Sequence, residues 1–158
     1  MKLSTLWTVA AVVVFVATSG PAVAQAQDAA ASVDKRQASM KRMGGDLKAI
    51  SEYGKGQGDE QKALAAAQDI VETQKTLADL FPKGTGSDAF PGKSYANPKL
   101  WAEWDKFLGD NKLAQEKAGA LLKTVQSGDK AAIAAAPGDI WDNGCQICHK
   151  SYREKKPS

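Results

Sequence analysis

Both cysteines of this chain and its only histidine fall within five consecutive residues, Cys145 to His149. On an α-helix, residues three and four apart share one face, so Cys145, Cys148 and His149 would all point at the same object. Two thiols beside an imidazole at this spacing are the pattern that attaches a c-type haem. We therefore expect a helix near the C-terminus that holds one haem through two thioether bonds, with His149 as a ligand of the iron.

Other uses of these three side chains fit the sequence less well. A structural zinc site normally takes four protein ligands, whereas the chain has only 2 Cys and 1 His. A thioredoxin-like dithiol would need a strand–helix–strand setting, which the sequence lacks. A disulfide between Cys145 and Cys148 would close a very small loop, stabilise little and leave His149 unexplained.

The N-terminus predicts export. A positive start and an apolar run over residues 6–20 precede Ala-Val-Ala at 22–24, which is the pattern of a secretory signal peptide. Residues 1–24 are expected to be removed, which leaves residues 25–158 as one haem domain; a cut after Ala26 is the second candidate. The alternative is a retained membrane anchor, since the run approaches the length of a thin span. With cleavage, we expect a periplasmic protein without a membrane segment.

The charge balance argues against one class of partner. The chain has 21 basic and 18 acidic side chains, a net charge of +3, and one of the basic groups lies in the segment expected to be removed. No long basic stripe appears in the middle of the chain. Nucleic acid is therefore not an expected partner.

The rest of the sequence is typical of helices. It is rich in Ala, Lys, Gln and Leu and has no strand-like alternation of useful length. The first helix has an apolar stripe at spacings of three and four that includes Met40 and Met43. The predicted fold is all-α, an antiparallel four-helix bundle. Its helices are expected over residues 32–53, 59–81, 98–126 and 129–155.

Glycine and proline mark the breaks between these helices. A glycine-rich stop at 54–58 and a turn at 127–129 are short. Residues 82–98 contain three prolines and three glycines, and they predict a long crossover loop between the second and third helices. Asn97 and Pro98 are a good start for the third helix. The fourth helix is expected to be interrupted at 137–138, because Pro137 lacks an N–H.

At this point the chain resembles the class II c-type cytochromes, the cytochrome c′ family. The resemblance rests on "CQICHKSYR" near the end of a helical chain, "KRQASM" in the first helix and "PKLW" at the start of the third. It covers nearly all of the sequence after the leader, and Pro137-Gly138-Asp139 departs from it by lengthening the stretch before the attachment site. It implies one covalent haem c, periplasmic redox proteins as partners, a possible homodimer through the first two helices, and no enzymatic activity.

The sixth iron ligand separates two branches of that family. In one branch an apolar side chain covers the iron, which is high-spin and binds small gases; in the other a methionine of the first helix ligates it. The resemblance places the residue four after the Arg of the Arg-Gln pair at the iron, which is Met40 here. A thioether is a suitable soft ligand opposite histidine, although either methionine could simply fill core space. We expect a low-spin electron carrier ligated by Met40, with Met43 as the fallback ligand and a high-spin, NO- or CO-binding protein as the alternative.

The resemblance also assigns residues around the haem. It places Arg36 and Gln37 beside the haem, with Arg36 paired to a propionate, and Arg153 close to His149. Arg36 could instead extend to solvent, and Arg153 could be a solvated charge at the helix end. The tryptophans at 101, 104 and 141 are expected to pack against the core or the haem. Lysines at 150, 155 and 156 could steer an acidic partner or simply be a solvated helix end.

Overall fold

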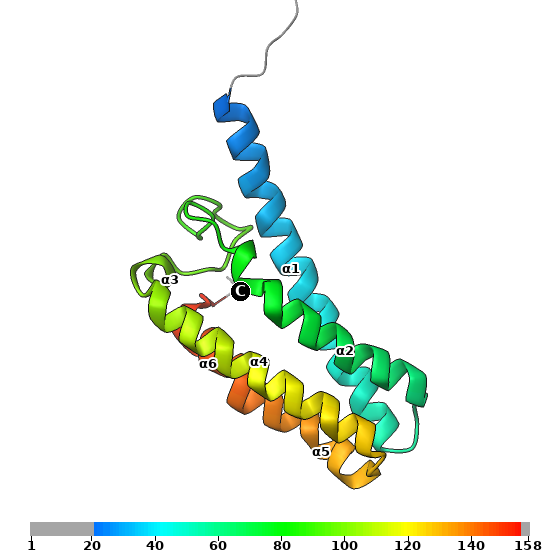
Figure 1. Cartoon of the computed structure of the whole chain (residues 1–158). Coiled ribbons are helices and arrows are strands. Elements are labelled where there is room, and N and C mark those ends of the chain that lie inside the picture. The colour runs from blue at the N-terminus through cyan, green and yellow to red at the C-terminus, as the bar shows by residue number, and fades with distance from the viewer. Residues whose placement is uncertain (1–20, 156–158) are drawn as a thin grey trace, which may run out of the picture.

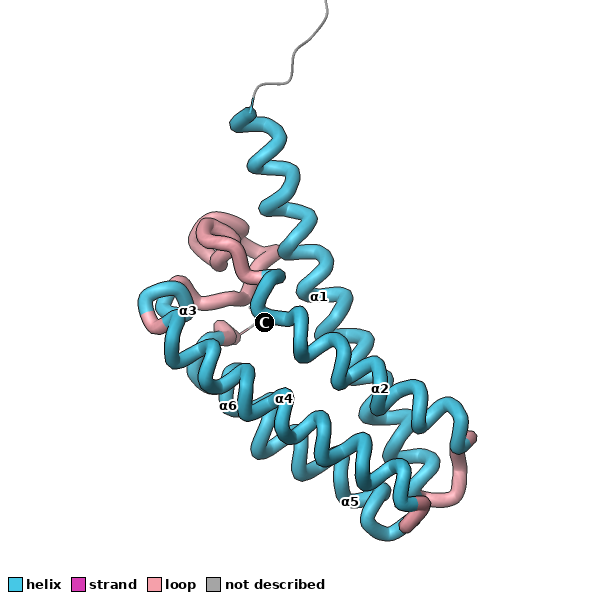
Figure 2. The backbone as a smooth tube through the Cα atoms, in the orientation of Figure 1, coloured by secondary structure: helices cyan, strands magenta, loops and turns pink. Residues whose placement is uncertain are grey.

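Residues 21–155 are described by the computed structural model, and their regular structure is helical (Figure 2). The predicted signal peptide therefore lies almost wholly outside the described residues. The α-helices are α1 (Pro21–Gly54), α2 (Glu60–Thr76), α3 (Lys99–Ala102), α4 (Trp104–Ser127), α5 (Lys130–Ile140) and α6 (Gln146–Tyr152). A 3₁₀ turn, η1 (Leu77–Leu80), extends α2, and a π-helical segment, η2 (Trp141–Cys145), joins α5 to α6.

Four long helical segments pack in an antiparallel ring. α1 packs against α2 and α5, and α4 packs against the same two helices, so the order around the bundle is α1, α2, α4, α5 (Figure 1). Short turns join α1 to α2 and α4 to α5, while the loop after η1 crosses one end of the bundle to reach α3. This confirms the predicted four-helix bundle and its long crossover between the second and third helices. Within residues 21–155, no helix is both long enough and apolar enough to cross a bilayer.

The helix ends follow the local chemistry of the sequence. Asp59 accepts a hydrogen bond from the Lys62 N–H at 2.9 Å and caps α2, and Asp129 caps α5 through the Ala132 N–H at 3.1 Å. α4 ends at Ser127 and is followed by Gly128, whose φ of 72° is left-handed and suits a residue without a Cβ. The turns expected from the glycines and aspartates are therefore the turns that form.

Helix α1 begins earlier than expected. Its 34 residues start at Pro21 instead of Ser32, which gives a length of about 50 Å, and its first turns extend past the other helices (Figure 1). Proline suits the first turn of a helix, and the alanine-rich stretch after it has high helix propensity. The apolar stripe that predicted the helix starts only where α1 has neighbours to pack against.

The third and fourth helices are each divided, at places that periodicity does not reveal. The third breaks at Glu103, between α3 and α4. The fourth was expected to be interrupted at Pro137–Gly138, but α5 continues through both to Ile140, and the irregular segment is η2. One extra residue in a helical turn rotates the next segment by about 100°, so η2 resets the face that α6 presents relative to α5.

Two groups of buried side chains form the core. The closed-end core lies between the two short turns and is mainly aliphatic: Ile50, Ala63, Ala67, Ile70, Leu121, Val125 and Ile133. The open-end core lies near the crossover loop and is largely aromatic: Leu77, Phe81, Leu100, Phe107 and Tyr152. The second group surrounds the candidate site.

Candidate haem site

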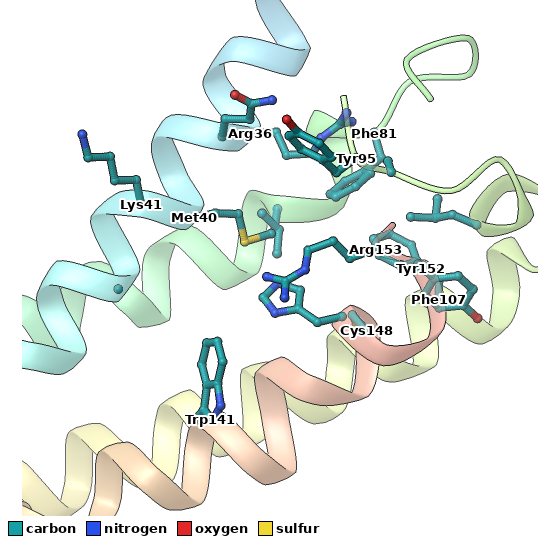
Figure 3. Close-up of a pocket in the computed structure, with 16 residues that line it drawn as sticks. Arg36, Met40, Lys41, Phe81, Tyr95, Phe107, Trp141, Cys148, Tyr152 and Arg153 are labelled. Atoms are coloured by element: carbon teal, nitrogen blue, oxygen red, sulfur yellow. The ribbon is translucent and has the colours of Figure 1, made fainter. Parts of the chain in front are cut away.

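The open-end core borders a cavity of about 510 Å³. Its walls come from α1, η1, the crossover loop, α4 and the η2–α6 segment, and aromatic rings make up much of them (Figure 3). Phe107 packs against both Phe81 and Tyr152, with ring centroids 5.0 and 5.9 Å apart. A mostly apolar pocket of this size is typical of cofactor sites.

The structure brings the three side chains of the attachment motif to the same space. Cys148 and His149, on α6, line the large cavity. Cys145, at the end of η2, lines an adjoining cavity of about 60 Å³ that also borders Cys148 and His149. Both thiols are free and half-buried. Because η2 and α6 form one continuous helical stretch, the motif presents two thiols and an imidazole to one side.

His149 has the protonation state that an iron ligand requires. Burial, together with the nearby charge of Arg153, lowers the pKa of His149 to about 4, so the imidazole is neutral at pH 7. Its Nδ1 is buried and has no hydrogen-bond partner among the described residues. The Trp141 ring stands edge-on to the imidazole, with centroids 5.9 Å apart. Trp141 itself is 40% exposed, so it forms the solvent side of this wall.

The pKa values of the two thiols are shifted in the opposite direction from those of a redox-active dithiol. Burial raises the pKa of Cys148 to about 11 and also raises the pKa of Cys145, whereas redox-active cysteines have lowered values. In the described part of the chain, no three His, Cys, Asp or Glu side chains converge where they could hold a metal ion directly. The local chemistry therefore favours porphyrin attachment over a thiol-redox or zinc site.

The two methionines of α1 lie in different surroundings. Met40 lines both cavities, and its sulfur is directed into the large one (Figure 3). Met43 is 7% exposed and borders only the small cavity, where its Sδ lies 3.8 Å from the Gln74 Nε2. Met40 is thus the methionine that faces the large cavity from α1, and His149 faces it from α6.

Arg36 is buried by the crossover loop. Its side chain is 5% exposed, which makes the expectation of an arginine extended to solvent wrong. The two terminal nitrogens donate to the Leu80 and Thr85 carbonyls and to the Thr85 and Ser94 hydroxyls at 2.8–3.2 Å. The guanidinium also lies 4.4 Å from the Phe81 ring centroid. Burial lowers the pKa of Arg36 to about 10, which leaves it charged at pH 7.

Gln37 and Arg153 also line the large cavity. The Gln37 Nε2 donates to the Lys93 carbonyl in the crossover loop. Arg153 is exposed, and its backbone N–H donates to the His149 carbonyl at 3.2 Å. Among the basic residues after the motif, Lys150 and Lys155 are exposed, as in a solvated helix end, and Lys156 lies outside the described residues.

Some cavity residues were missed by the sequence interpretation. Tyr95 and Ala96 line the cavity from the crossover loop, where no periodic pattern marks a buried position. Gly44 borders both cavities and lies four residues after Met40, so it is on the same face of α1. That spacing was visible in the sequence and could have identified Gly44.

These features together fit a haem. The cavity has a suitable size and apolar walls, and two thiols lie beside a neutral imidazole with an unpartnered nitrogen. The residues that would hold the group are Cys145 and Cys148 by thioether bonds and His149 by ligation. The Met40 sulfur faces the same space from α1.

Known proteins with similar sequences and folds point the same way. The family model described as Cytochrome C′ matches residues 31–153. A cytochrome c-556 of Agrobacterium tumefaciens (strain II Chrys) is 33% identical over 129 residues, which cover 80% of this chain and 100% of that protein. A cytochrome c′ of Rhodospirillum rubrum is 33% identical over 138 residues, with 83% and 87% covered.

Two solved structures of similar fold are also cytochromes c′. One is the protein from Thermochromatium tepidum, with a TM-score of 0.71, 22% identity, and 80% of this chain and 97% of that one covered. The other, described for its ligand-controlled dimer dissociation, has a TM-score of 0.70 and 23% identity over the same shares. This chain belongs to the cytochrome c′ family, and it is a c-type cytochrome with one haem c bound covalently through Cys145 and Cys148.

Proposed function

We propose that this protein is a periplasmic one-electron carrier whose haem iron is ligated by His149 and Met40. The observation that carries the proposal is the placement of Met40, whose sulfur is directed from α1 into the cavity that His149 lines from α6. Haem iron supplies a single electron by changing between its ferric and ferrous states. The protein ligands of the iron determine whether another molecule can bind to it.

Two protein ligands would close both axial positions. With imidazole on one side and thioether on the other, no position stays open for substrate, and methionine ligation raises the reduction potential. A helical bundle also holds its ligands with little change of geometry. Both properties suit a carrier that passes electrons between periplasmic redox proteins.

The export and assembly proposals rest on separate observations. The leader pattern over residues 1–24 supports a periplasmic location. One cytochrome c′ of similar fold forms a dimer whose dissociation is ligand-controlled, and this supports a homodimer here. The resemblance to the family suggests the first two helices, α1 and α2, as its interface. Sedimentation of this protein with and without carbon monoxide tests the assembly. A homodimer that dissociates when carbon monoxide is added would link its assembly to ligand binding at the haem.

A second candidate function is the binding of nitric oxide or carbon monoxide by a high-spin form. It is supported by the 60 Å³ cavity beside Met40, which offers space next to the large cavity. In that form Met40 would be displaced, and a diatomic gas would take its position.

Ferric absorption spectra of three proteins test the assignment. The wild type is expected to be low-spin with the weak far-red methionine-to-iron band. Met40→Ala is expected to lose that band and become high-spin, because Met40 is the one methionine among the described residues that line the large cavity. Met43→Ala is the matched control and is expected to keep the wild-type spectrum. Identical spectra for wild type and Met40→Ala would refute Met40 as the ligand.

A further inference from the structure

The crossover loop is fastened to α1 by Arg36. The Arg36 guanidinium donates to the Ser94 hydroxyl at 2.8 Å and to the Thr85 carbonyl at 2.9 Å. The Ser94 hydroxyl in turn donates to the same Thr85 carbonyl at 2.8 Å. Thr85 and Ser94 are 0% and 2% exposed, so water does not compete for these bonds. One charged side chain, a turn before Met40, therefore holds two points of the loop.

The same loop is fastened to the end of α6 by its backbone. The Asn97 N–H donates to the Tyr152 carbonyl at 2.8 Å, and the Glu154 N–H donates to the Tyr95 carbonyl at 2.9 Å. Between these bonds, Ala96 lies opposite Arg153 in an antiparallel bridge. These contacts begin three residues after His149.

Ser94 connects the two attachments. Its hydroxyl accepts the Ala96 N–H at 3.2 Å while it accepts from Arg36. The hydroxyl thus fixes the backbone of Ala96 to α1. The residues on either side, Tyr95 and Asn97, make the backbone bonds to the residues after His149. α1 packs on α2, α5 and η1, but it has no extensive packing against α6, because the cavity lies between them. The loop is thus the hydrogen-bonded link between the helix of Met40 and the helix of His149.

We propose that residues 94–97 form a clasp that sets the separation of α1 and α6, with Arg36 as its positioning residue, and so holds Met40 at the iron. This inference rests on the proposed ligation by His149 and Met40. It gives Arg36 a task other than binding a haem propionate, since all four of its terminal N–H groups are committed to protein acceptors.

A clasp of this kind would control how often the Met40 thioether dissociates from the iron. The two axial ligands come from helices that do not fix one another, so the thioether stays on the iron only while the helices are held at the right separation. Arg36 and Met40 are four residues apart on one face of α1, so the bonds of Arg36 hold α1 one turn away from Met40. Loosening the clasp therefore favours the gas-accessible form.

The most conservative test removes one hydroxyl. Ser94→Ala deletes the acceptor shared by Arg36 and Ala96 and leaves every residue that lines the large cavity unchanged. Because a buried hydrogen bond to a charged donor is lost, carbon monoxide is expected to bind the ferrous holoprotein about tenfold faster than in the wild type. Ser87→Ala is the matched control in the same loop, since its side chain takes no part in the bonds to Arg36. A rise of similar size in both variants would overturn the proposal.

A second pair of variants tests whether Arg36 and Ser94 act as one unit. Arg36→Lys keeps the charge but loses the planar fork of donors, so it is expected to speed carbon monoxide binding as Ser94→Ala does. The double variant should bind no faster than Arg36→Lys alone, because both changes break the same link. Independent, multiplying effects would contradict a single clasp.

Hydrogen exchange gives a measurement that does not depend on the axial ligand. In Ser94→Ala the backbone amides of Asn97 and Glu154 are expected to exchange faster, and in Ser87→Ala they should match the wild type. A wild-type spectrum without the methionine band would refute the proposed function, while these amides would still report on the clasp. Unchanged exchange, or faster exchange with unchanged carbon monoxide binding in a methionine-ligated protein, would refute the clasp.

Discussion

The two ends of the bundle are built differently. At the closed end, aliphatic side chains such as Ile50 and Ile133, both 0% exposed, fill the space between the helices. There Gly54 lies so close to the Ala134 backbone that a Cβ could not fit. At the open end, aromatic side chains surround a cavity of about 510 Å³. Side chains alone fill the closed-end core, whereas the open-end core encloses a cavity large enough for a haem.

The closed end therefore contributes mainly to the stability of the domain, and the open end provides the haem site. Protein interiors are normally close-packed, and an apolar cavity of this size would be costly if nothing filled it. The haem that the family binds completes the open-end core, and the closed-end core holds the helices that carry its ligands. Changes at the closed end should therefore alter stability with little effect on the spectrum, and changes at the open end should alter both.

The largest effect should come from removing the haem attachment. Cys145→Ser with Cys148→Ser takes away both thioether bonds, so haem should be lost on denaturation and the mass should fall by one haem. Without the bound group, the apolar walls of the cavity lose the group that they pack against, so we expect the free energy of unfolding to fall by at least about 3–5 kcal/mol, the cost of removing one large aromatic side chain from a core. Urea unfolding of the two proteins gives the measurement.

Amide exchange shows whether that loss is confined to one end. The amides of α6 and η1 should exchange rapidly in the double variant, while those around Val125 and Ile70 keep their protection. Equal loss of protection at both ends would contradict a self-sufficient closed end.

A matched pair of core truncations compares the ends directly. Ile133→Ala and Leu100→Ala each remove a side chain that is 0% and 1% exposed, respectively, and each should cost about 2–5 kcal/mol of stability. Leu100 lines the large cavity, so its loss should also change the haem spectrum, whereas Ile133→Ala should leave the spectrum as in the wild type. A spectral change in the Ile133 variant alone would reverse the assignment of the two ends.

Alanine substitutions at two adjacent glycines of α1, Gly44 and Gly45, should have smaller effects that differ from each other. A Cβ at either Gly44 or Gly45 would meet no atom within 4 Å, so alanine at Gly45 should stabilise the helix by about 0.5–1 kcal/mol. Gly44 borders both cavities, so a methyl group there would point toward the porphyrin. Gly44→Ala should therefore shift the spectrum and lose the gain in stability. Thermal unfolding and absorption of both holoproteins compare them, and identical behaviour would count against a haem contact at Gly44.

The smallest predicted effect is a pH dependence at the α1–α2 contact. Burial and the neighbouring Asp69 raise the pKa of Asp46 from 3.8 to about 6. A raised carboxyl pKa means that the folded state binds more protons between these values, so this contribution to stability is present below about pH 4 and is lost as the pH rises through about 6. Asp46→Asn should flatten that slope and add less than about 1 kcal/mol at pH 7. Urea unfolding across this pH range measures it, and a steeper slope in the variant would contradict the assignment.

The pattern of the sequence predicted the helices and the attachment site because both depend on local spacing. The three-and-four spacing of apolar residues defines an inward face, and Cys145, Cys148 and His149 share a face on any helix. Glycine and proline located the crossover loop in the same way. Capping by Asp59 and Asp129 is likewise local, which is why these helix starts agree with the structure.

Features that depend on contacts between distant segments were not predictable in this way. The bonds of Arg36 to Thr85 and Ser94 join residues 49 and 58 positions apart, and no pattern within α1 indicates them. The π-helical turn of η2 stands where the sequence carried no signal, since one extra residue in a turn leaves no mark on the spacing of apolar residues, whereas α5 continues through the interruption expected at Pro137. The first turns of α1 form because their residues have high helix propensity, although they extend past the other helices. An apolar stripe marks only the part of a helix that packs against neighbours, so it did not predict this early start.

The most direct test of this account is X-ray absorption at the iron edge of the ferric wild-type holoprotein. Ligation by His149 and Met40 predicts one sulfur among six iron ligands, with nitrogens in the other positions. A five-coordinate iron surrounded only by nitrogen, or a sixth ligand that is oxygen, would contradict the central claim that Met40 ligates the iron.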